Sequence, residues 1–207
     1  MCERTRYDVI VVDPPWSYGA DTGRPNRVAE AHYATIGNNG REISRRTGAG
    51  IENIIASAPV PEWAADNCHL YLWTTNPKLP FTFAVMEAWG FAYKTMLTWE
   101  KVSESGGTHG GGMGFFFRGA TEHVLFGVRG RKPIPTHMRV PNLIRARPTG
   151  HSAKPDRFYA VLDRLYPGEA KIDVFARKAR IGWAVWGLEA PTEPPAQADM
   201  LEVARAG

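Results

Sequence analysis

Cysteine is scarce in this chain: only Cys2 and Cys68 occur among its 207 residues. Two cysteines cannot build the disulfide framework that stabilises many small secreted domains, and the sequence has no zinc-site spacing of cysteines and histidines. A chain of this length can bury a full hydrophobic core without such cross-links. We therefore expect one domain in a reducing compartment, with no structural metal.

Long apolar runs are also missing, and the first residues, MCERTRYD, lack the apolar core of a secretion signal. No segment approaches the length that a membrane-spanning helix requires. The glycine-rich stretch 103–114 lacks the GxxxxGK[ST] pattern of a P-loop, so we interpret it as a flexible loop. These absences predict a cytoplasmic protein without membrane contact.

The most informative segment that is present covers residues 8–16, DVIVVDPPW. Four consecutive apolar residues are typical of a strand buried on both faces of a parallel sheet. The strand ends abruptly at Asp13, Pro14, Pro15 and Trp16, and prolines cannot continue a sheet. Ligands of open α/β sheets bind beyond the carboxyl ends of the strands. The sequence therefore predicts that this tetrad forms the catalytic site.

The tetrad suits a planar heterocycle that bears an amino group. The Asp13 carboxylate and the Pro14 carbonyl can both accept hydrogen bonds from an exocyclic amine, and the Trp16 ring can stack on a base, a contact worth roughly 1–3 kcal/mol. In the alternative interpretation, the strand simply ends in a turn and Trp16 is a core residue. The combination of acid, carbonyl and ring favours the functional interpretation.

Positive charge is concentrated in one segment. The net charge is +4, but residues 188–207 hold four acids and one base, which leaves +7 for the rest of the chain. Residues 129–147 contain six lysines and arginines and no acid. We expect nucleic-acid phosphates to bind there, with Arg145 and Arg147 as substrate contacts and His151 as a further candidate. The alternatives are a solvated basic loop and, for His151, packing within its loop.

Alternating strand and helix patterns predict an α/β fold with a doubly wound sheet. We expect strands at 68–74, 91–99, 121–128 and 170–175, and helices from 76 to 89 and from 154 to 165. The helix after Asn76-Pro77 should bury Leu79, Phe83, Met86 and Trp89. Residues 17–50 and 129–153 are predicted loops. The predicted domain covers 1–189, and 190–207 is predicted to be a flexible acidic tail rich in proline and alanine.

The DPPW segment resembles the MTA-type adenine-N6 methyltransferases, whose eukaryotic members methylate adenosine in messenger RNA. Further elements resemble the same family in the same order along the chain. They are His32–Ile36, Leu70–Trp73, Glu122–Gly130, His151–Asp156, Asp173–Arg177 and Gly182–Gly187. Each motif alone is weak evidence, but the ordered set from Asp13 to Gly187 is specific.

This resemblance implies a Rossmann-like S-adenosylmethionine-dependent methyltransferase that is circularly permuted, with the DPPW strand first and the cofactor strand last. Those two strands should then be neighbours in the sheet. The implied reaction is methylation of the N6 amine of adenine, in DNA by preference or alternatively in RNA. The implied site residues are Tyr33 at the substrate, with a core tyrosine as the alternative, and Asp13, Lys154, Phe175 and Arg177 at the cofactor. Arg180 and Glu189 are further cofactor candidates, because they can replace contacts whose family residues this chain lacks.

One departure from the family pattern concerns the cofactor. Relatives often close with Trp-Gly-Asn, whereas this chain has Trp186-Gly187-Leu188, so cofactor affinity is in question and Glu189 is a candidate for compensation. A catalytically silent, nucleic-acid-binding subunit is therefore an alternative, although it would not need Asp13 or Trp16. The resemblance also implies a homodimer or heterodimer, with residues 103–114 at the interface.

Overall fold

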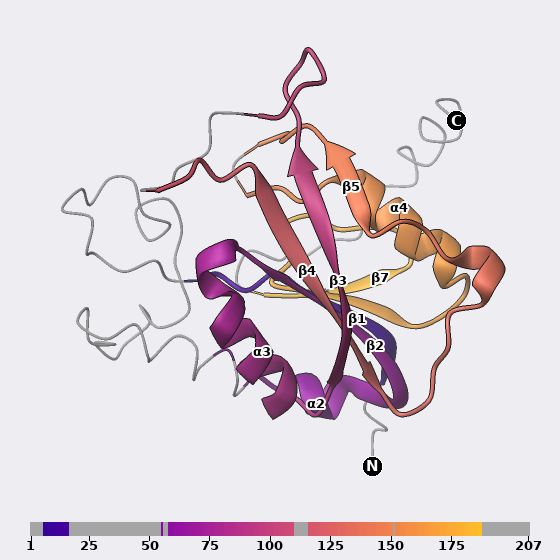
Figure 1. Cartoon of the computed structure of the whole chain (residues 1–207). Coiled ribbons are helices and arrows are strands. Elements are labelled where there is room, and N and C mark those ends of the chain that lie inside the picture. Colours follow the sequence, from indigo (N-terminus) through magenta and orange to yellow (C-terminus); the bar gives the residue numbers. More distant parts are fainter. Residues whose placement is uncertain (1–5, 17–54, 56–57, 110–115, 151, 188–207) are drawn as a thin grey trace.

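The computed structural model describes residues 6–16, 55, 58–109, 116–150 and 152–187. These residues fold into one sheet with helices on both faces (Figure 1). In chain order the elements are β1 (Tyr7–Val12), α2 (Val60–Trp63), β2 (Ala64–Thr74), η3 (Asn76–Lys78), α3 (Leu79–Ala88), β3 (Ala92–Lys101), β4 (Thr121–Arg129), η4 (Thr136–Met138), β5 (Leu143–Ala146), α4 (Asp156–Leu165), β6 (Lys171–Val174) and β7 (Trp183–Trp186).

The seven strands lie in the order β5-β3-β4-β2-β1-β6-β7. Strand β4 is antiparallel to both of its neighbours, whereas all other neighbouring strands are parallel. Strand β1 lies between β2 and β6, although β6 comes near the other end of the chain. The expectation that the DPPW strand and the 170–175 strand are neighbours is therefore confirmed.

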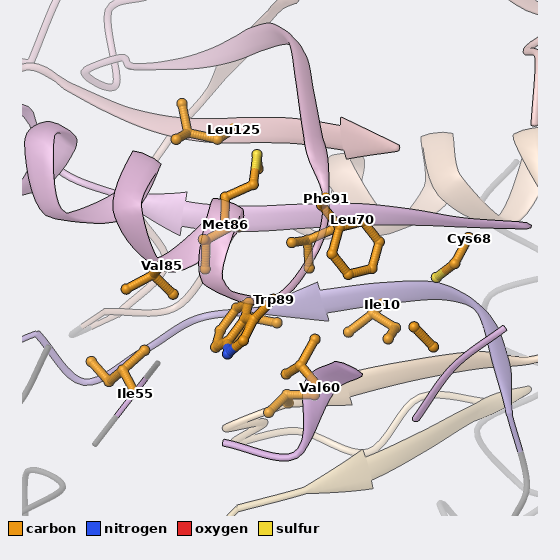
Figure 2. Packing of buried hydrophobic residues seen from close by; sticks show 14 of the residues in the cluster. Ile10, Ile55, Val60, Cys68, Leu70, Val85, Met86, Trp89, Phe91 and Leu125 are labelled. Carbon is orange, nitrogen blue, oxygen red and sulfur yellow. The ribbon is translucent and has the colours of Figure 1, made fainter. Parts of the chain in front are cut away.

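The apolar run of β1 contributes to two hydrophobic cores, one on each face of the sheet, because successive side chains of a strand point to opposite faces. Ile10 and Val12 pack into the core beneath α2 and α3. Figure 2 shows this core, with side chains from α3 facing Ile10 and Leu70. Val9 and Val11 pack into the second core, beneath α4. The doubly wound arrangement follows from this burial on both faces.

The direction of the strands brings several segments to one edge of the sheet. Parallel strands β1, β2 and β6 all end there, at Val12, Thr74 and Val174. Strand β4 begins at the same edge because it is antiparallel to β2, with Thr74 opposite His123. The backbone N–H of Asp13 also donates to the carbonyl of Val174 at 3.2 Å. We refer to this side of the sheet as the carboxyl edge.

Two short strands were absent from the predicted elements. Strand β5 lies inside the segment 129–153 that was predicted to be loop, and β7 follows the last predicted strand. Each has four residues, and β5 buries only Ile144. Such short segments carry little periodicity, so their strand conformation depends on pairing with β3 and β6.

The helices also differ from the predictions in detail. Asn76 lies in the 3₁₀ turn η3, and Lys78 is the N-cap of α3. Phe83 is 41% exposed, so the prediction that it faces the core is wrong; Thr82 and Val85 are buried in its place. Helix α4 begins after Pro155, which leaves Lys154 in the preceding loop.

The predicted loop 17–50 and the predicted tail 190–207 lie outside the described residues. None of the helices within the described ranges has the length and apolar character needed to cross a membrane.

Gly130, the first residue after β4, packs tightly against the backbone of Asp66, and this close contact can be tested. Its φ is +66°, and a Cβ atom there would overlap the backbone oxygen of Asp66. Gly168 has a similar φ of +73° but open space around it. We expect Gly168→Ala to lower the free energy of unfolding by about 1 kcal/mol, because only the backbone conformation is strained. Gly130→Ala should cost at least about 2 kcal/mol more, because the backbone must also move. Urea denaturation of both variants measures this difference, and equal losses would contradict the packing described.

Candidate active site

Four charged side chains of alternating sign meet at the carboxyl edge. The Lys154 ammonium lies 2.9 Å from Asp13 Oδ1 and 3.3 Å from Glu122 Oε2, and Lys101 Nζ lies 2.6 Å from Glu122 Oε1. The Lys154 side chain is only 7% exposed. The four groups come from the end of β1, the end of β3, the start of β4 and the loop before α4. We call them the charge row.

The charge row controls protonation at the site. Burial alone would lower the pKa of Lys154, but Asp13 and Glu122 outweigh burial and raise it. Burial also works against the charge of Glu122, yet Lys154 and Lys101 hold its pKa below the ordinary value. Burial raises the pKa of Asp13, and the attraction of Lys154 opposes that increase. The row therefore holds Lys154 as a cation and Glu122 as an anion, while Asp13 has the least stabilised charge.

The loop before α4 positions Lys154 over an aromatic ring. Ser152 has a left-handed φ of 60°, which is uncommon for a residue other than glycine, and Pro155 caps the helix. The Lys154 ammonium then lies 5.2 Å from the centre of the Trp73 ring and 3.4 Å from the Ser152 carbonyl oxygen. With Asp13 and Glu122, these contacts give the ammonium three oxygen partners.

The structure closes the DPPW segment into a tight turn. The backbone N–H of Trp16 donates to the Pro14 carbonyl at 2.8 Å, and a carbonyl has a second lone pair that can accept another donor. Trp16 is only 4% exposed, and its indole Nε1 donates to the Trp73 carbonyl at 3.0 Å. The alternative that Trp16 is a core residue therefore describes its position in this structure.

The end of β6 forms the neighbouring wall of the edge. Phe175 has a φ of 63° and its N–H donates to the carbonyl of Trp186. A Cβ atom on Gly187 would lie 2.8 Å from the Phe175 Cα, so only glycine allows this approach. The sequence predicted Phe175 as a cofactor residue, and the structure places its strained backbone beside Asp13.

A buried acid, Asp173, lies beneath that wall. Its Oδ2 is 3.1 Å from an Arg180 nitrogen, and the Arg180 guanidinium stacks 3.3 Å from the centre of the Tyr159 ring. Asp173 Oδ1 is buried without a hydrogen-bond partner in the described part of the chain. Burial raises the pKa of Asp173 to about 7, although Arg180 opposes the increase.

Several predicted site residues have other positions or lie outside the description. Arg145 and Arg147 are exposed and pair with Glu100 at 2.9 Å and Glu104 at 3.3 Å. Arg145 belongs to strand β5 rather than to a loop. Arg177, just beyond the end of β6, is close enough to Asp13 for its charge to oppose the rise in the pKa of Asp13 that burial causes. Three predicted residues lie outside the described residues: Tyr33, His151 and Glu189.

Sequence reasoning gave no role to Glu122 and did not consider Lys101. Little in the sequence indicated their role, because an acid at the start of one strand and a lysine at the end of another are common on protein surfaces. Only the antiparallel direction of β4 brings both to Lys154. Within the described ranges, no group of three histidine, cysteine or acidic side chains could hold a metal ion.

Glu122→Gln tests the energetic importance of the charge row. The change leaves Lys154 and Lys101 without one of their buried anions, and breaking a buried ion pair typically costs 3–5 kcal/mol. We expect the free energy of unfolding at pH 7 to fall by about 3 kcal/mol in urea denaturation. Glu104→Gln is the matched control, because Glu104 is 87% exposed in its pair with Arg147 and should show no measurable change. Similar stability of both variants would mean that the row contributes little.

Asp173 predicts a pH dependence of stability. Because its folded-state pKa is raised to about 7 from the ordinary 3.8, the folded state binds the proton more tightly than the unfolded state does. Its contribution to stability is therefore present at low pH and falls as the pH rises from about 4 to 7. Asp173→Asn should remove this decrease, which we expect to be on the order of 3 kcal/mol. Urea denaturation at pH 4 and pH 8 compares the two proteins, and an identical pH dependence would exclude the raised pKa.

A sequence model of the MT-A70 family matches residues 7–189. The chain is 33% identical to the Type II methyltransferase M.MunI of Mycoplasma sp, and the alignment covers 96% of this chain and 85% of that protein. It is 29% identical to the N(6)-adenine-specific methyltransferase METTL4 of Homo sapiens, covering 90% of this chain and 38% of that protein.

The chain is also 25% identical to the N(6)-adenosine-methyltransferase catalytic subunit METTL3 of Homo sapiens. That alignment covers 88% of this chain and 28% of METTL3. The chain thus spans most of M.MunI but less than two-fifths of METTL4 and of METTL3.

Proposed function

The chain belongs to the MT-A70 family, and we propose that it methylates the N6 amine of adenine in nucleic acid, with DNA as the favoured polymer. The family match confirms the resemblance that the DPPW segment indicated. The names of M.MunI, a Type II methyltransferase, and METTL4, an N(6)-adenine-specific methyltransferase, support this reaction. Identity is lower to METTL3, whose name specifies adenosine, the ribonucleoside. This difference favours DNA over RNA.

The observation that carries the proposal is the position of the Asp13 carboxylate. It lies at the carboxyl end of β1, is held by Lys154, and adjoins the end of β6. An acid aligned by a buried cation has a fixed direction, because moving it would break a desolvated ion pair. Fixed acceptors of this kind can orient an amine before reaction without reorganising during it.

The chemistry requires two acceptors at the adenine amine. The Asp13 carboxylate and the second lone pair of the Pro14 carbonyl are suited to accept its two N–H groups. Accepting both directs the nitrogen lone pair away from the ring and stabilises the positive charge that forms on nitrogen. When that lone pair bonds to the transferred methyl carbon, the nitrogen carries an extra proton, which Asp13 or water can accept. Asp13 does not need to be a strong base, because a methylated arylammonium is acidic.

The residues at the edge fit S-adenosylmethionine, which bears a carboxylate, an ammonium and a sulfonium. When bound, this group supplies a methyl on positively charged sulfur, which leaves as a neutral thioether. Asp173 Oδ1, which is buried and has no hydrogen-bond partner among the described residues, is suited to the ammonium. Arg177 and Arg180 supply positive charge close to Asp13 and Asp173. Lys154 would have to exchange one of its present oxygen partners before it could bind the cofactor carboxylate.

For Trp16 we propose a positioning role in place of base stacking. Its ring is almost fully buried, and its indole bond to the Trp73 carbonyl joins the end of β1 to the end of β2. This contact holds the turn in which Pro14 presents its carbonyl. A base would need a ring face that this structure does not expose.

The arrangement of strands supports a circularly permuted order of the fold. Among the described strands, the one that ends just before Asp13 comes first, the one that ends just before Phe175 comes near the end, and the two pair side by side. A second subunit, implied by the family resemblance, stays a prediction. Phe116 and Phe117, next to the predicted interface segment, are 95% and 88% exposed, which supports it.

Two alternatives remain with the main proposal. The same reaction on RNA differs only in the polymer, and no described contact distinguishes a 2′-hydroxyl. A silent nucleic-acid-binding subunit is the other alternative. The intact contact between Asp13 and Lys154 favours catalysis over that alternative, because nucleic-acid binding alone needs no buried carboxylate at this edge.

Labelled S-adenosylmethionine tests the function with duplex DNA, single-stranded DNA and RNA in parallel. We expect N6-methyladenine in DNA, identified by digestion and chromatography. Asp13→Asn should lower the turnover number roughly 10²–10³-fold, as is typical for loss of one transition-state hydrogen-bonding group. Asp66→Asn, the same chemical change at a carboxylate that is 92% exposed, should leave turnover unchanged.

The outcomes separate the alternatives. If most of the methyl label enters RNA, the substrate is RNA and the proposal of DNA is wrong. Label in no polymer, together with salt-dependent nucleic-acid binding, would favour the silent subunit. Equal turnover of Asp13→Asn and the wild type would show that Asp13 is not the catalytic acceptor.

A further inference from the structure

A concave site lies on the face of the sheet away from the carboxyl edge, and its lining contains no member of the charge row. It is a cavity of about 850 Å³ between the face of the sheet that α4 covers, α4 itself and the segment 130–142. Its floor includes the middle of β2, where His69 and Tyr71 lie, and the last part of β4, where Phe126 and Val128 lie. The charge row is at the opposite ends of these strands. The cavity is therefore separate from the proposed catalytic site.

The cavity exists because a helix covers only part of this face. Among the described elements, α4 is the helix that packs on it, and its residues Val161, Leu162 and Leu165 form one wall. The segment 130–142 forms the opposite wall as irregular chain that includes the short turn η4. In Figure 1 this segment runs beside α4 from the end of β4 to β5. The volume falls within the roughly 300–1,000 Å³ that is usual for ligand sites.

The lining of the cavity is apolar with a purely cationic rim. The aromatic side chains of the lining are nearly as buried as Trp16, whereas the aliphatic Leu97, Val128 and Ile134 keep part of their surface exposed. The lining also contains Lys94, Arg131, Lys132 and Arg139 but no acid. Lys132 pairs with Asp8 and Glu169. Lys94 and Arg131 make no ion pair with any residue that the structure describes, and both side chains are exposed. The rim therefore offers positive charge to an anion.

The polar groups on the floor already have partners. His69 contacts the Tyr166 hydroxyl and the Lys132 carbonyl, each at 2.6 Å, and the Tyr71 hydroxyl lies 2.7 Å from that of Tyr166. These groups do not require a hydrogen-bonding ligand. The floor consequently suits a flat or apolar group, while the anion of the ligand would lie at the rim.

Strand β5 connects this cavity to the carboxyl edge. Pro141 and Asn142, which precede β5, line the cavity, and Arg145 and Arg147 follow toward the carboxyl edge. Glu100 and Glu104 partly neutralise these two arginines. Such exposed ion pairs are worth at most about 1 kcal/mol, so phosphates can compete with the acids. A polynucleotide that crosses the catalytic edge can follow this strand to the cavity.

We propose that the cavity binds an unstacked nucleotide of the substrate strand, away from the target adenine, with its base on the apolar floor and its phosphate at Lys94 and Arg131. The inference rests on the proposed function, because it requires a nucleic-acid substrate. One nucleotide would satisfy both parts of the cavity, since its base suits the apolar floor and its phosphate suits the cationic rim. The segment 130–142 would then take part in recognising the substrate strand.

The test measures the affinity for fluorescein-labelled single-stranded oligodeoxyadenylates of two lengths by fluorescence anisotropy. The short strand has about 4 nucleotides and the long strand about 16, the range of typical single-strand sites. Thr95→Trp fills the cavity from an exposed position of β3, and Thr95→Val is its control at the same position. Arg131→Glu reverses a rim charge, and Arg164→Glu makes the same change on the exposed side of α4.

We expect Thr95→Trp and Arg131→Glu to weaken binding of the long strand about tenfold, the loss expected when one base no longer packs on apolar surface, and to leave the short strand unaffected. Arg131→Glu should also lower the salt dependence of log K by about 0.7, as for one lost phosphate contact. The two controls should match the wild type with both strands.

Equal affinity of all variants for the long strand would overturn this inference, while methyl transfer by the wild type to the same strands would keep the proposed function. Failure of the wild type both to bind and to methylate the strands would reject both. Free deoxyadenosine monophosphate is a further competitor. If Thr95→Trp abolishes its binding and leaves long-strand affinity unchanged, the cavity binds a small nucleotide and the strand proposal is wrong.

Discussion

The candidate site depends on one buried cation, the ammonium of Lys154. A lone charge in such a position would be strongly unfavourable, because the protein interior replaces water poorly. Asp13 on one side and Glu122 on the other compensate for that cost, and Lys101 does the same for Glu122. The site is thus neutral as a set, although each member is charged. Removing any one member leaves a neighbour with an uncompensated charge, which is why the geometry of Asp13 is coupled to residues that need not touch a substrate.

The topology of the sheet makes this arrangement possible. If β4 ran parallel to β2, Glu122 would lie at the opposite edge, far from Lys154. Its antiparallel direction places the start of β4 beside the end of β2, at the edge of the sheet where β1 also ends. The pairing of β1 with β6 then brings Phe175 and Asp173 to the same edge from a distant part of the chain. Long-range pairing, rather than any local motif, assembles the site.

This dependence explains which features the sequence could predict. The apolar run of β1 and the amphipathic pattern of α4 reflect burial that every residue of the segment shares, so periodicity reveals them. Strands β5 and β7 have four residues each, and their identity comes from neighbours that sequence periodicity does not show. The partners of Lys154 are also invisible to local reasoning, because Asp13 and Glu122 lie on different strands. The burial of Trp16 depends in the same way on Trp73, a contact between separate elements.

The number of basic residues in a segment also says little about its exposed charge until their partners in the fold are known. The segment 129–147 seemed to be a uniform basic stripe, but folding divides it. Arg129 donates to the carbonyls of Pro61 and Trp89, and so it holds the chain together. Lys132 pairs with two acids, whereas Arg131 lies at the rim of the cavity. A count of basic residues therefore overstates the charge that a polyanion can meet. The charge that a polyanion can meet is therefore that of residues such as Arg131, which lies at the rim of the apolar cavity beside the segment 130–142.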